Sequence, residues 1–300
     1  MTAERALIIV NPISGGADKS GLCEEISKTL TDKKIDARWF ETNGEKDLER
    51  LQKEISQFNP DLLVAVGGDG TVHLAAQALE QHNNIPIAII PSGSGNGLSK
   101  DLGIPQNNSD ALALLSDNRL KAVDTLRING KLCVHIADLG FNALVVKRFD
   151  EAPTRGPGTY AKVAMQEYIN YEPGYYKIET DAGNFEGEAF MITITNGRNF
   201  GSSATVNPKA IMDDGKFEVC ILAPFPKATA PVLLFRMYNQ TIDESVYSKI
   251  ISCRKAVISS PETELLQIDG EIMPPVNKIE VQIKEKGLTV LLPPAIEGNQ

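Results

Sequence analysis

Several residue types are scarce in this chain of 300 residues, and each scarcity excludes a class of protein. The 4 cysteines are widely spaced and form no C-x-x-C pair, which excludes a disulfide framework and indicates a reducing compartment. The 3 histidines have no metal-ligand spacing, which disfavours a zinc site or a hydrolase triad. No apolar run approaches the roughly 20 residues of a membrane-spanning helix. The sequence therefore predicts a soluble, cytoplasmic protein with no transmembrane segment.

Positively charged residues are fewer than negatively charged ones. The chain has 30 Lys and Arg against 39 Asp and Glu, a formal net charge of −9. A nucleic-acid-binding protein needs a basic footprint, so this partner is excluded. Hydrophobic residues at 42% and charged residues at 23% are typical of a globular protein. The length allows one large domain or two ordinary ones.

The first third of the chain alternates strand and helix patterns. Short, continuous apolar runs are typical of strands that are buried on both faces, and amphipathic stretches separate them. The predicted strands are 7–10, 36–41, 62–66 and 85–90, and the predicted helices are 17–34, 45–57 and 72–79. This order predicts an α/β domain with a doubly wound parallel sheet, which we place at residues 1–125.

Hairpin signals dominate after residue 120. Turn sequences lie between alternating runs at 129–130, 181–184, 213–216 and 285–287. Two helices are expected among them, at about 158–171 and 228–240. The pattern predicts a second, mainly antiparallel β-sandwich domain over residues 126–288.

Three glycine-rich loops follow predicted strands of the first domain, at 11–16, 67–71 and 91–97. Ligands of open α/β sheets bind beyond the carboxyl ends of the strands. Glycine lets several backbone N–H groups point into one concavity, which binds anions. Each loop alone has a structural reading, because Asp69-Gly70 is a common turn pair and Thr71 could cap a helix. Together, three such loops predict a polyphosphate site.

Other nucleotide-binding motifs are missing from the sequence. No G-x-x-x-x-G-K-[ST] loop, H-R-D or D-F-G element is present. Gly93-Ser94-Gly95 begins a G-x-G-x-x-G pattern, but Leu98 occupies its last glycine position. A Walker-type or dinucleotide-binding fold is therefore disfavoured.

Taken in order, the three loops resemble those of the diacylglycerol kinase catalytic-domain family, which includes bacterial lipid kinases and sphingosine kinases. The matching residues are Asn11-Pro-x-Ser-Gly-Gly16, Gly67-Gly-Asp-Gly-Thr71 and Pro91-Ser-Gly-Ser-Gly-Asn96. Asn196–Gly201, Pro208–Gly215 and Asp269-Gly270-Glu271 resemble the second-domain signatures of the family. Gly-Gly-Asp-Gly-Thr alone is shared with NAD kinases, whereas the ordered set is more specific.

The resemblance implies an ATP- and Mg-dependent lipid kinase that acts transiently at a membrane surface. It would bind ATP along the glycine loops and a diacylglycerol-like or sphingoid-like lipid in the second domain. It also suggests that residues 289–300 return to the first domain. The oligomeric state is left open, with a homodimer as one expectation.

Site residues follow from the same resemblance. The expected nucleotide-binding residues are Asn11, Ser14, Gly15, Gly16, Thr42, Gly67, Gly68, Asp69, Gly70, Thr71, Gly93, Ser94, Gly95 and Asn96. A lipid hydroxyl must lose its proton to attack a phosphate, which calls for a carboxylate. The resemblance assigns this role to Asp269, with Asp69 as the second choice and Glu271 as a further acidic candidate. It places magnesium near Asp124, Asp213 or Asp214.

Two departures from the family pattern leave the substrate open. Bacterial diacylglycerol kinases usually have Asp where this chain has Gly97, and their glycine-rich stretch is replaced by Gly201-Ser202-Ser203. Two alternatives to a lipid kinase therefore remain: an NAD kinase-related enzyme, and a catalytically silent regulator that binds a nucleotide or a lipid.

Overall fold

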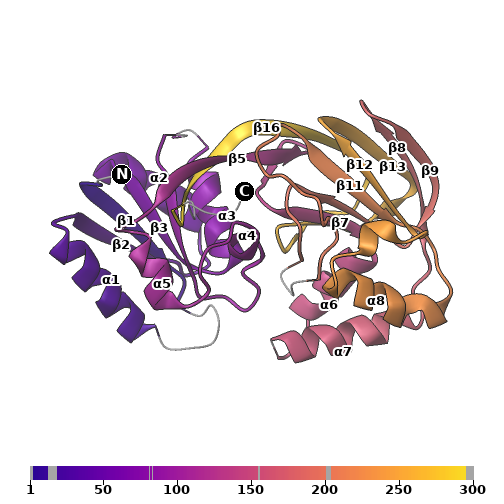
Figure 1. Cartoon of the computed structure of the whole chain (residues 1–300), viewed down its shortest axis with the longest axis horizontal. Helices are drawn as coiled ribbons and strands as arrows, with labels where there is room; N and C mark the ends of the chain where they lie inside the picture. Colours follow the sequence, from indigo (N-terminus) through magenta and orange to yellow (C-terminus); the bar gives the residue numbers. More distant parts are fainter. Residues whose placement is uncertain are drawn as a thin grey trace. The chain divides into compact units, whose positions relative to one another are not determined.

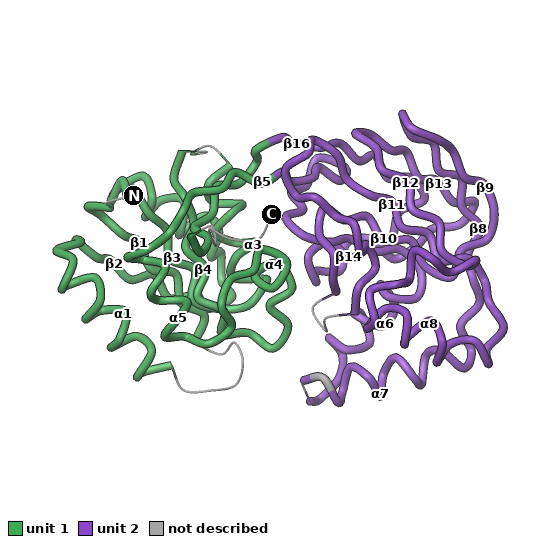
Figure 2. Tube along the Cα trace, in the orientation of Figure 1, with its two compact units in different colours: residues 1–123, 286–300 green, residues 124–285 purple. Residues whose placement is uncertain are grey.

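The computed structural model describes residues 3–12, 19–80, 82, 84–154, 156–200 and 204–294. The chain divides into two compact units, drawn in different colours in Figure 2. Unit 1 comprises residues 1–123 and 286–300, and unit 2 comprises residues 124–285. Two strands, β5 (Arg119–Ile128) and β16 (Val276–Leu292), contribute residues to both units.

Unit 1 is built on a parallel sheet with the strand order β2-β1-β3-β4, and β4 pairs in turn with the C-terminal part of β16. These strands are β1 (Arg5–Val10), β2 (Asp36–Glu41), β3 (Leu62–Gly67) and β4 (Ile87–Pro91). Nearly every residue of β1, β3 and β4 is buried, because helices cover both faces of the sheet. The continuous apolar runs in the sequence have this origin.

The helices of unit 1 lie on the two faces of this sheet (Figure 1). They are α1 (Ser20–Asp32), α2 (Asp47–Phe58), α3 (Asp69–Ala78), α4 (Gly97–Asp101) and α5 (Asn108–Ala113). Leu22 and Ile26 of α1 and Leu112 of α5 pack into one hydrophobic cluster with Ile8 and Val64 of the sheet. The prediction of a doubly wound α/β fold is confirmed, although α3 begins at Asp69 rather than at Val72.

Unit 2 contains a six-stranded antiparallel sheet, with the order β12-β11-β10-β7-β14-β15. Its strands are β7 (Ile136–Gly140), β10 (Met191–Thr195), β11 (Phe217–Leu222), β12 (Ser248–Cys253), β14 (Leu266–Ile268) and β15 (Glu271–Ile272). A second layer has the order β16-β13-β8-β9, and β5 joins it by pairing with both β16 and β6. The new strands of this layer are β6 (Lys131–Cys133), β8 (Gly174–Thr180), β9 (Asn184–Ala189) and β13 (Lys255–Glu264).

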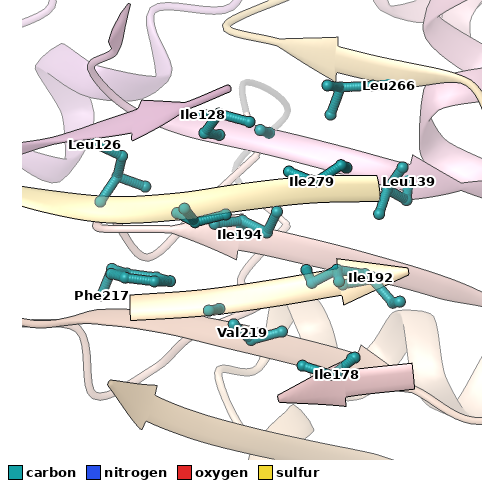
Figure 3. Close-up of a cluster of buried hydrophobic side chains, with 14 of the residues drawn as sticks. Leu126, Ile128, Leu139, Ile178, Ile192, Ile194, Phe217, Val219, Leu266 and Ile279 are labelled. Atoms are coloured by element: carbon teal, nitrogen blue, oxygen red, sulfur yellow. The ribbon is translucent and has the colours of Figure 1, made fainter. Parts of the chain in front are cut away.

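The two layers of unit 2 enclose a hydrophobic core (Figure 3). Ile192 and Val219 reach it from the six-stranded sheet, and Ile178 and Ile279 reach it from the second layer. All four side chains are almost completely buried. The predicted antiparallel β-sandwich is confirmed.

Helices cover the other face of the six-stranded sheet. They are α6 (Phe141–Asp150), α7 (Pro157–Tyr168) and α8 (Ala230–Tyr238), with the short 3-10 helices η2 (Lys227–Thr229) and η3 (Ile242–Glu244). Leu233 and Met237 of α8 pack there on Phe190 and Met191. No helix in the described part of the chain is long and apolar enough to cross a bilayer.

One sequence-based expectation about a turn was wrong. Residues 285–287 were expected to separate two strands, but β16 runs without interruption through them. Lys286 adopts a left-handed backbone conformation with φ 51°, so the chain changes direction locally without reversing.

Candidate active site

The glycine loops after β3 and β4 touch each other through their backbones. A Cβ at position 93 would lie 2.4 Å from the Cα of Gly68, and a Cβ at position 68 would lie 3.1 Å from the Cα of Gly93. Atoms this close leave no room for a side chain on Gly93. The contact brings together the carboxyl ends of two neighbouring strands, where ligands of open α/β sheets bind.

Asp69 ties these two loops together. Its carboxylate accepts hydrogen bonds from the N–H groups of Gly97 at 3.0 Å and Leu98 at 3.1 Å. These donors belong to the first residues of α4, whose N–H groups have no acceptor within the helix. Asp69 is itself the first residue of α3. Its side chain therefore caps a second helix, α4, which follows the other glycine loop.

Thr71 and Gly67 pack against each other at the end of β3. A Cβ at position 67 would lie only 2.1 Å from the Thr71 hydroxyl oxygen, so glycine is required there. Gly70 is different, because it is exposed and a Cβ there would meet no atom within 4 Å. The loop thus contains glycines that packing requires and one that packing does not.

Asn96 holds its own loop in place. Its backbone is left-handed, with φ 55°, and its side-chain oxygen accepts the N–H of Gly93 at 3.0 Å. Its side-chain nitrogen donates to Gln106 at 3.4 Å. In the same loop, Ser94 is exposed and Gly95 is half-buried.

The remaining predicted nucleotide residues lie at the ends of β1 and β2. The N–H of Asn11 donates to Val66 at 3.3 Å, and the N–H of Thr42 donates to Val10 at 3.0 Å. Both residues are therefore at the same edge of the sheet as the two glycine loops. Ser14, Gly15 and Gly16 lie outside the described residues.

Lys19 is a candidate that the sequence analysis missed. Its side chain is buried, and its ammonium group donates to the carbonyl oxygen of Asn11 at 2.5 Å. Burial lowers the pKa of Lys19. A lysine between a glycine loop and a helix start was the available signal, because such a cation suits a bound phosphate.

Asp269 and Gly270 form the tight turn between β14 and β15. Both residues have positive φ, 49° and 90°, as Asp-Gly hairpin turns often do. The Asp269 carboxylate is buried and accepts three backbone hydrogen bonds, from Val134 at 2.7 Å, His135 at 2.9 Å and Ile136 at 3.0 Å. A carboxylate offers about four acceptor positions, so most of its capacity is used in holding this segment.

Glu271 follows in the same turn and has a different environment. It is exposed, and its carboxylate forms no hydrogen bond or ion pair with any residue that the structure describes. Of the three acidic residues predicted to act in catalysis, Glu271 alone has a carboxylate without a hydrogen-bond partner among the residues that the structure describes.

The three carboxylates assigned to magnesium do not gather into a site. Asp124 is buried and accepts the N–H of Gly215 at 2.7 Å, whereas Asp213 and Asp214 are exposed. Over the described ranges, no group of three His, Cys, Asp or Glu residues is placed to hold a metal ion. The geometry therefore does not fit a resident ion held by these three carboxylates. In phosphotransferases, Mg²⁺ is usually held by one or two carboxylates together with the substrate phosphates.

Two domains of known families match this chain, one over most of unit 1 and one over most of unit 2. Residues 5–128 match the diacylglycerol kinase catalytic domain, and residues 135–292 match the YegS C-terminal NAD kinase beta sandwich-like domain. The chain belongs to the diacylglycerol kinase catalytic-domain family. Members of this family are phosphotransferases with an alcohol group as acceptor, and this chain is such an enzyme.

Individual relatives extend over most of the chain. It is 28% identical to the probable lipid kinase YegS-like of Shewanella frigidimarina, over 83% of this chain and 82% of that protein. It is 26% identical to the protein of the same name from Citrobacter koseri, over 98% and 97% of the two chains. This chain also matches the crystal structure of a diacylglycerol kinase from Bacillus anthracis, over 99% of each chain, with a TM-score of 0.78 and 22% sequence identity. This match shows that the two proteins share a fold.

Proposed function

We propose that the chain is an ATP- and Mg-dependent lipid kinase that phosphorylates a hydroxyl group of a diacylglycerol-like or sphingoid-like lipid. The main support is the backbone contact between Gly68 and Gly93, which gathers two glycine loops at one edge of the sheet of unit 1. Two relatives are named as probable lipid kinases, which supports a lipid acceptor.

Unit 1 is the proposed nucleotide-binding domain. The first N–H groups of α3 have no acceptor within the helix and, with its dipole, favour a bound phosphate. Asp69 and Asn96 contribute by fixing the loops around this position. Lys19 adds a cation near the end of β1.

Unit 2 is the proposed acceptor domain, and its Asp269–Glu271 turn is the proposed source of the proton acceptor. Glu271 suits this role better than Asp269, because its carboxylate is exposed whereas that of Asp269 binds three backbone N–H groups. A positioned carboxylate base contributes roughly 10²–10⁴-fold to a rate. Magnesium is proposed to enter with the ATP phosphates, where it would neutralise charge on the transferred group.

A cytoplasmic enzyme that works at the membrane surface is part of this proposal. Met165 of α7 and Phe235 and Tyr238 of α8 are 72%, 66% and 61% exposed. The hydroxyl of Tyr168 donates to the carbonyl of Lys227 at 3.1 Å, which joins the end of α7 to the segment leading into α8. Replacing Met165 and Phe235 by serine should reduce cosedimentation with phospholipid vesicles, whereas Leu120→Ser, an exposed apolar position in unit 1, should not.

The function is tested by incubating the protein with labelled ATP, Mg²⁺ and a panel of diacylglycerol, sphingosine, ceramide and NAD. Label in a lipid product supports the proposal and identifies the lipid. Labelled NADP would instead indicate an NAD kinase-related enzyme. Nucleotide binding without any transfer would indicate a catalytically silent regulator.

A further inference from the structure

A row of polar side chains crosses three neighbouring strands of unit 2. Thr193 of β10, Asp138 of β7 and Gln267 of β14 are direct cross-strand partners. All three are at most 2% exposed. Their neighbours along the strands, such as Leu139 and Ile192, point into the sandwich core (Figure 3). By the alternation of a β-strand, the polar row therefore lies on the face that the helices cover.

Asp138 is surrounded by hydrogen-bond donors. Its carboxylate accepts from the Thr193 hydroxyl at 2.5 Å, the Asn142 amide at 2.6 Å and the Gln267 amide at 2.5 Å. The hydroxyl of Tyr160 donates in turn to the oxygen of the Asn142 amide at 2.5 Å. An ionised carboxylate only accepts hydrogen bonds, so it suits this environment better than a neutral amide would.

Gln267 connects this network to the Asp269–Glu271 turn. Its side-chain oxygen accepts the N–H of Gly270 at 2.7 Å, while its side-chain nitrogen donates to Asp138. The two contacts fix the orientation of the amide, because reversing it would place a donor against the N–H of Gly270. Asp138 thus determines which way Gln267 faces, and Gln267 holds the backbone of the turn.

A buried carboxylate has a cost that the fold could avoid. Burial raises the pKa of Asp138 to about 6, against the action of its three donors and of His135. Removing a charge from water costs several kcal/mol, and an apolar residue at such a position is often at least as stable. This costly acid is connected to the proposed catalytic turn through a single side chain, that of Gln267, which suggests a role in that turn.

We infer that Asp138 is a positioning residue for the Asp269–Glu271 turn. Through Gln267 it fixes the N–H of Gly270, and thereby the direction in which the Glu271 carboxylate points. The inference rests on the proposed function, in which this turn supplies the proton acceptor.

The first test follows the turn itself, without any assay of activity. Hydrogen exchange at the Gly270 amide, measured by NMR, should be at least about tenfold faster in Asp138→Leu than in the wild-type protein, because Gln267 loses the acceptor that fixes its orientation toward Gly270. Gln267→Met should have the same effect and keeps the test available if Asp138→Leu does not fold. Thr193→Val is the control, since it removes a bond to the other Asp138 oxygen, and it should leave this exchange rate unchanged.

The second test is kinetic. In a lipid phosphorylation assay, Asp138→Leu and Gln267→Met should lower kcat about tenfold or more, because small displacements of a catalytic group cost this much, and leave the KM for ATP within about twofold. Thr193→Val should retain wild-type kcat. Unchanged Gly270 exchange, or unchanged kcat, in both folded variants would overturn the inference.

Failure of the proposed function would give a different set of results from failure of this inference. If the wild-type protein transferred phosphate to no lipid, the kinase proposal would fall. The exchange comparison would still decide whether Asp138 orders the turn.

Discussion

The two units each contain an Asp-Gly pair in a tight loop. Comparing the two loops distinguishes an acidic residue that holds the backbone from one that is proposed to act in catalysis. Asp69 of unit 1 is half-buried and accepts two backbone N–H groups at the start of a helix. Asp269 of unit 2 is buried and accepts three within a hairpin turn. Both aspartates hold the backbone of another segment. In unit 2 an exposed carboxylate, Glu271, follows in the same turn, which separates the anchoring group from the group proposed to act in catalysis.

The largest effect is expected for Asp269→Ala. Three buried N–H groups would lose their acceptor, at about 1–3 kcal/mol each, so the free energy of unfolding should fall by about 3 kcal/mol or more. Urea unfolding measures this difference. Asp269→Asn keeps one oxygen and should cost less. A loss below about 1 kcal/mol for Asp269→Ala would show that the turn does not depend on this anchor.

The pH dependence of stability is a second test in unit 2, where the buried Asp138 contacts the turn through Gln267. The pKa of Asp138 is raised from 3.8 to about 6, so the folded state holds this proton more tightly than the unfolded state. The resulting stabilisation is complete below about pH 4 and is lost as the pH rises through about 6, amounting to about 3 kcal/mol at most. Compared with Asp138→Asn, the wild-type protein should lose stability over this range in urea unfolding. Parallel curves for the two proteins would contradict the expectation.

Gly93→Ala should disrupt the loop contact in unit 1. Its Cβ would lie 2.4 Å from backbone, which cannot yield as a flexible side chain does, so we expect a loss of about 1–3 kcal/mol. Gly70→Ala is the matched control, because a Cβ there meets nothing within 4 Å, and its effect should stay within about 0.5 kcal/mol. Equal stability of the two variants in thermal unfolding would argue against the contact.

The smallest effect on stability is expected for Asp69→Ala. The variant removes a capping carboxylate from the start of α4, where loss of a cap costs about 0.5–2 kcal/mol. Asp69 accepts two N–H groups and is half-buried, whereas Asp269 accepts three and is buried, so fewer hydrogen bonds are lost in Asp69→Ala. Chemical denaturation should therefore show a smaller loss than for Asp269→Ala, and an equal or larger loss would reverse the comparison.

Local sequence patterns predicted much of the fold. The apolar runs in β1, β3 and β4 identified strands because these strands are buried on both faces. Asn129-Gly130 identified the hairpin between β5 and β6, where both residues have positive φ. These features depend on neighbours in sequence, so the sequence contains them directly.

Long-range contacts were not predictable in this way. The Asp269 carboxylate binds N–H groups more than 130 residues earlier, and Asp138 meets its partners Thr193 and Gln267 only through sheet pairing. The sequence identified Asp269-Gly270-Glu271 as a motif through its resemblance to a family. It gave no indication that one carboxylate is enclosed by backbone donors while the other faces solvent.

The turnover of Glu271→Gln with ATP, Mg²⁺ and the lipid identified by the labelling assay decides which carboxylate of the unit 2 turn accepts the proton. We expect kcat to fall by roughly 10²-fold or more, with the free energy of unfolding within about 0.5 kcal/mol of wild type. Near-normal turnover in Glu271→Gln, with a large loss in a stably folded Asp269→Asn variant, would contradict this expectation and assign the proton acceptor to Asp269.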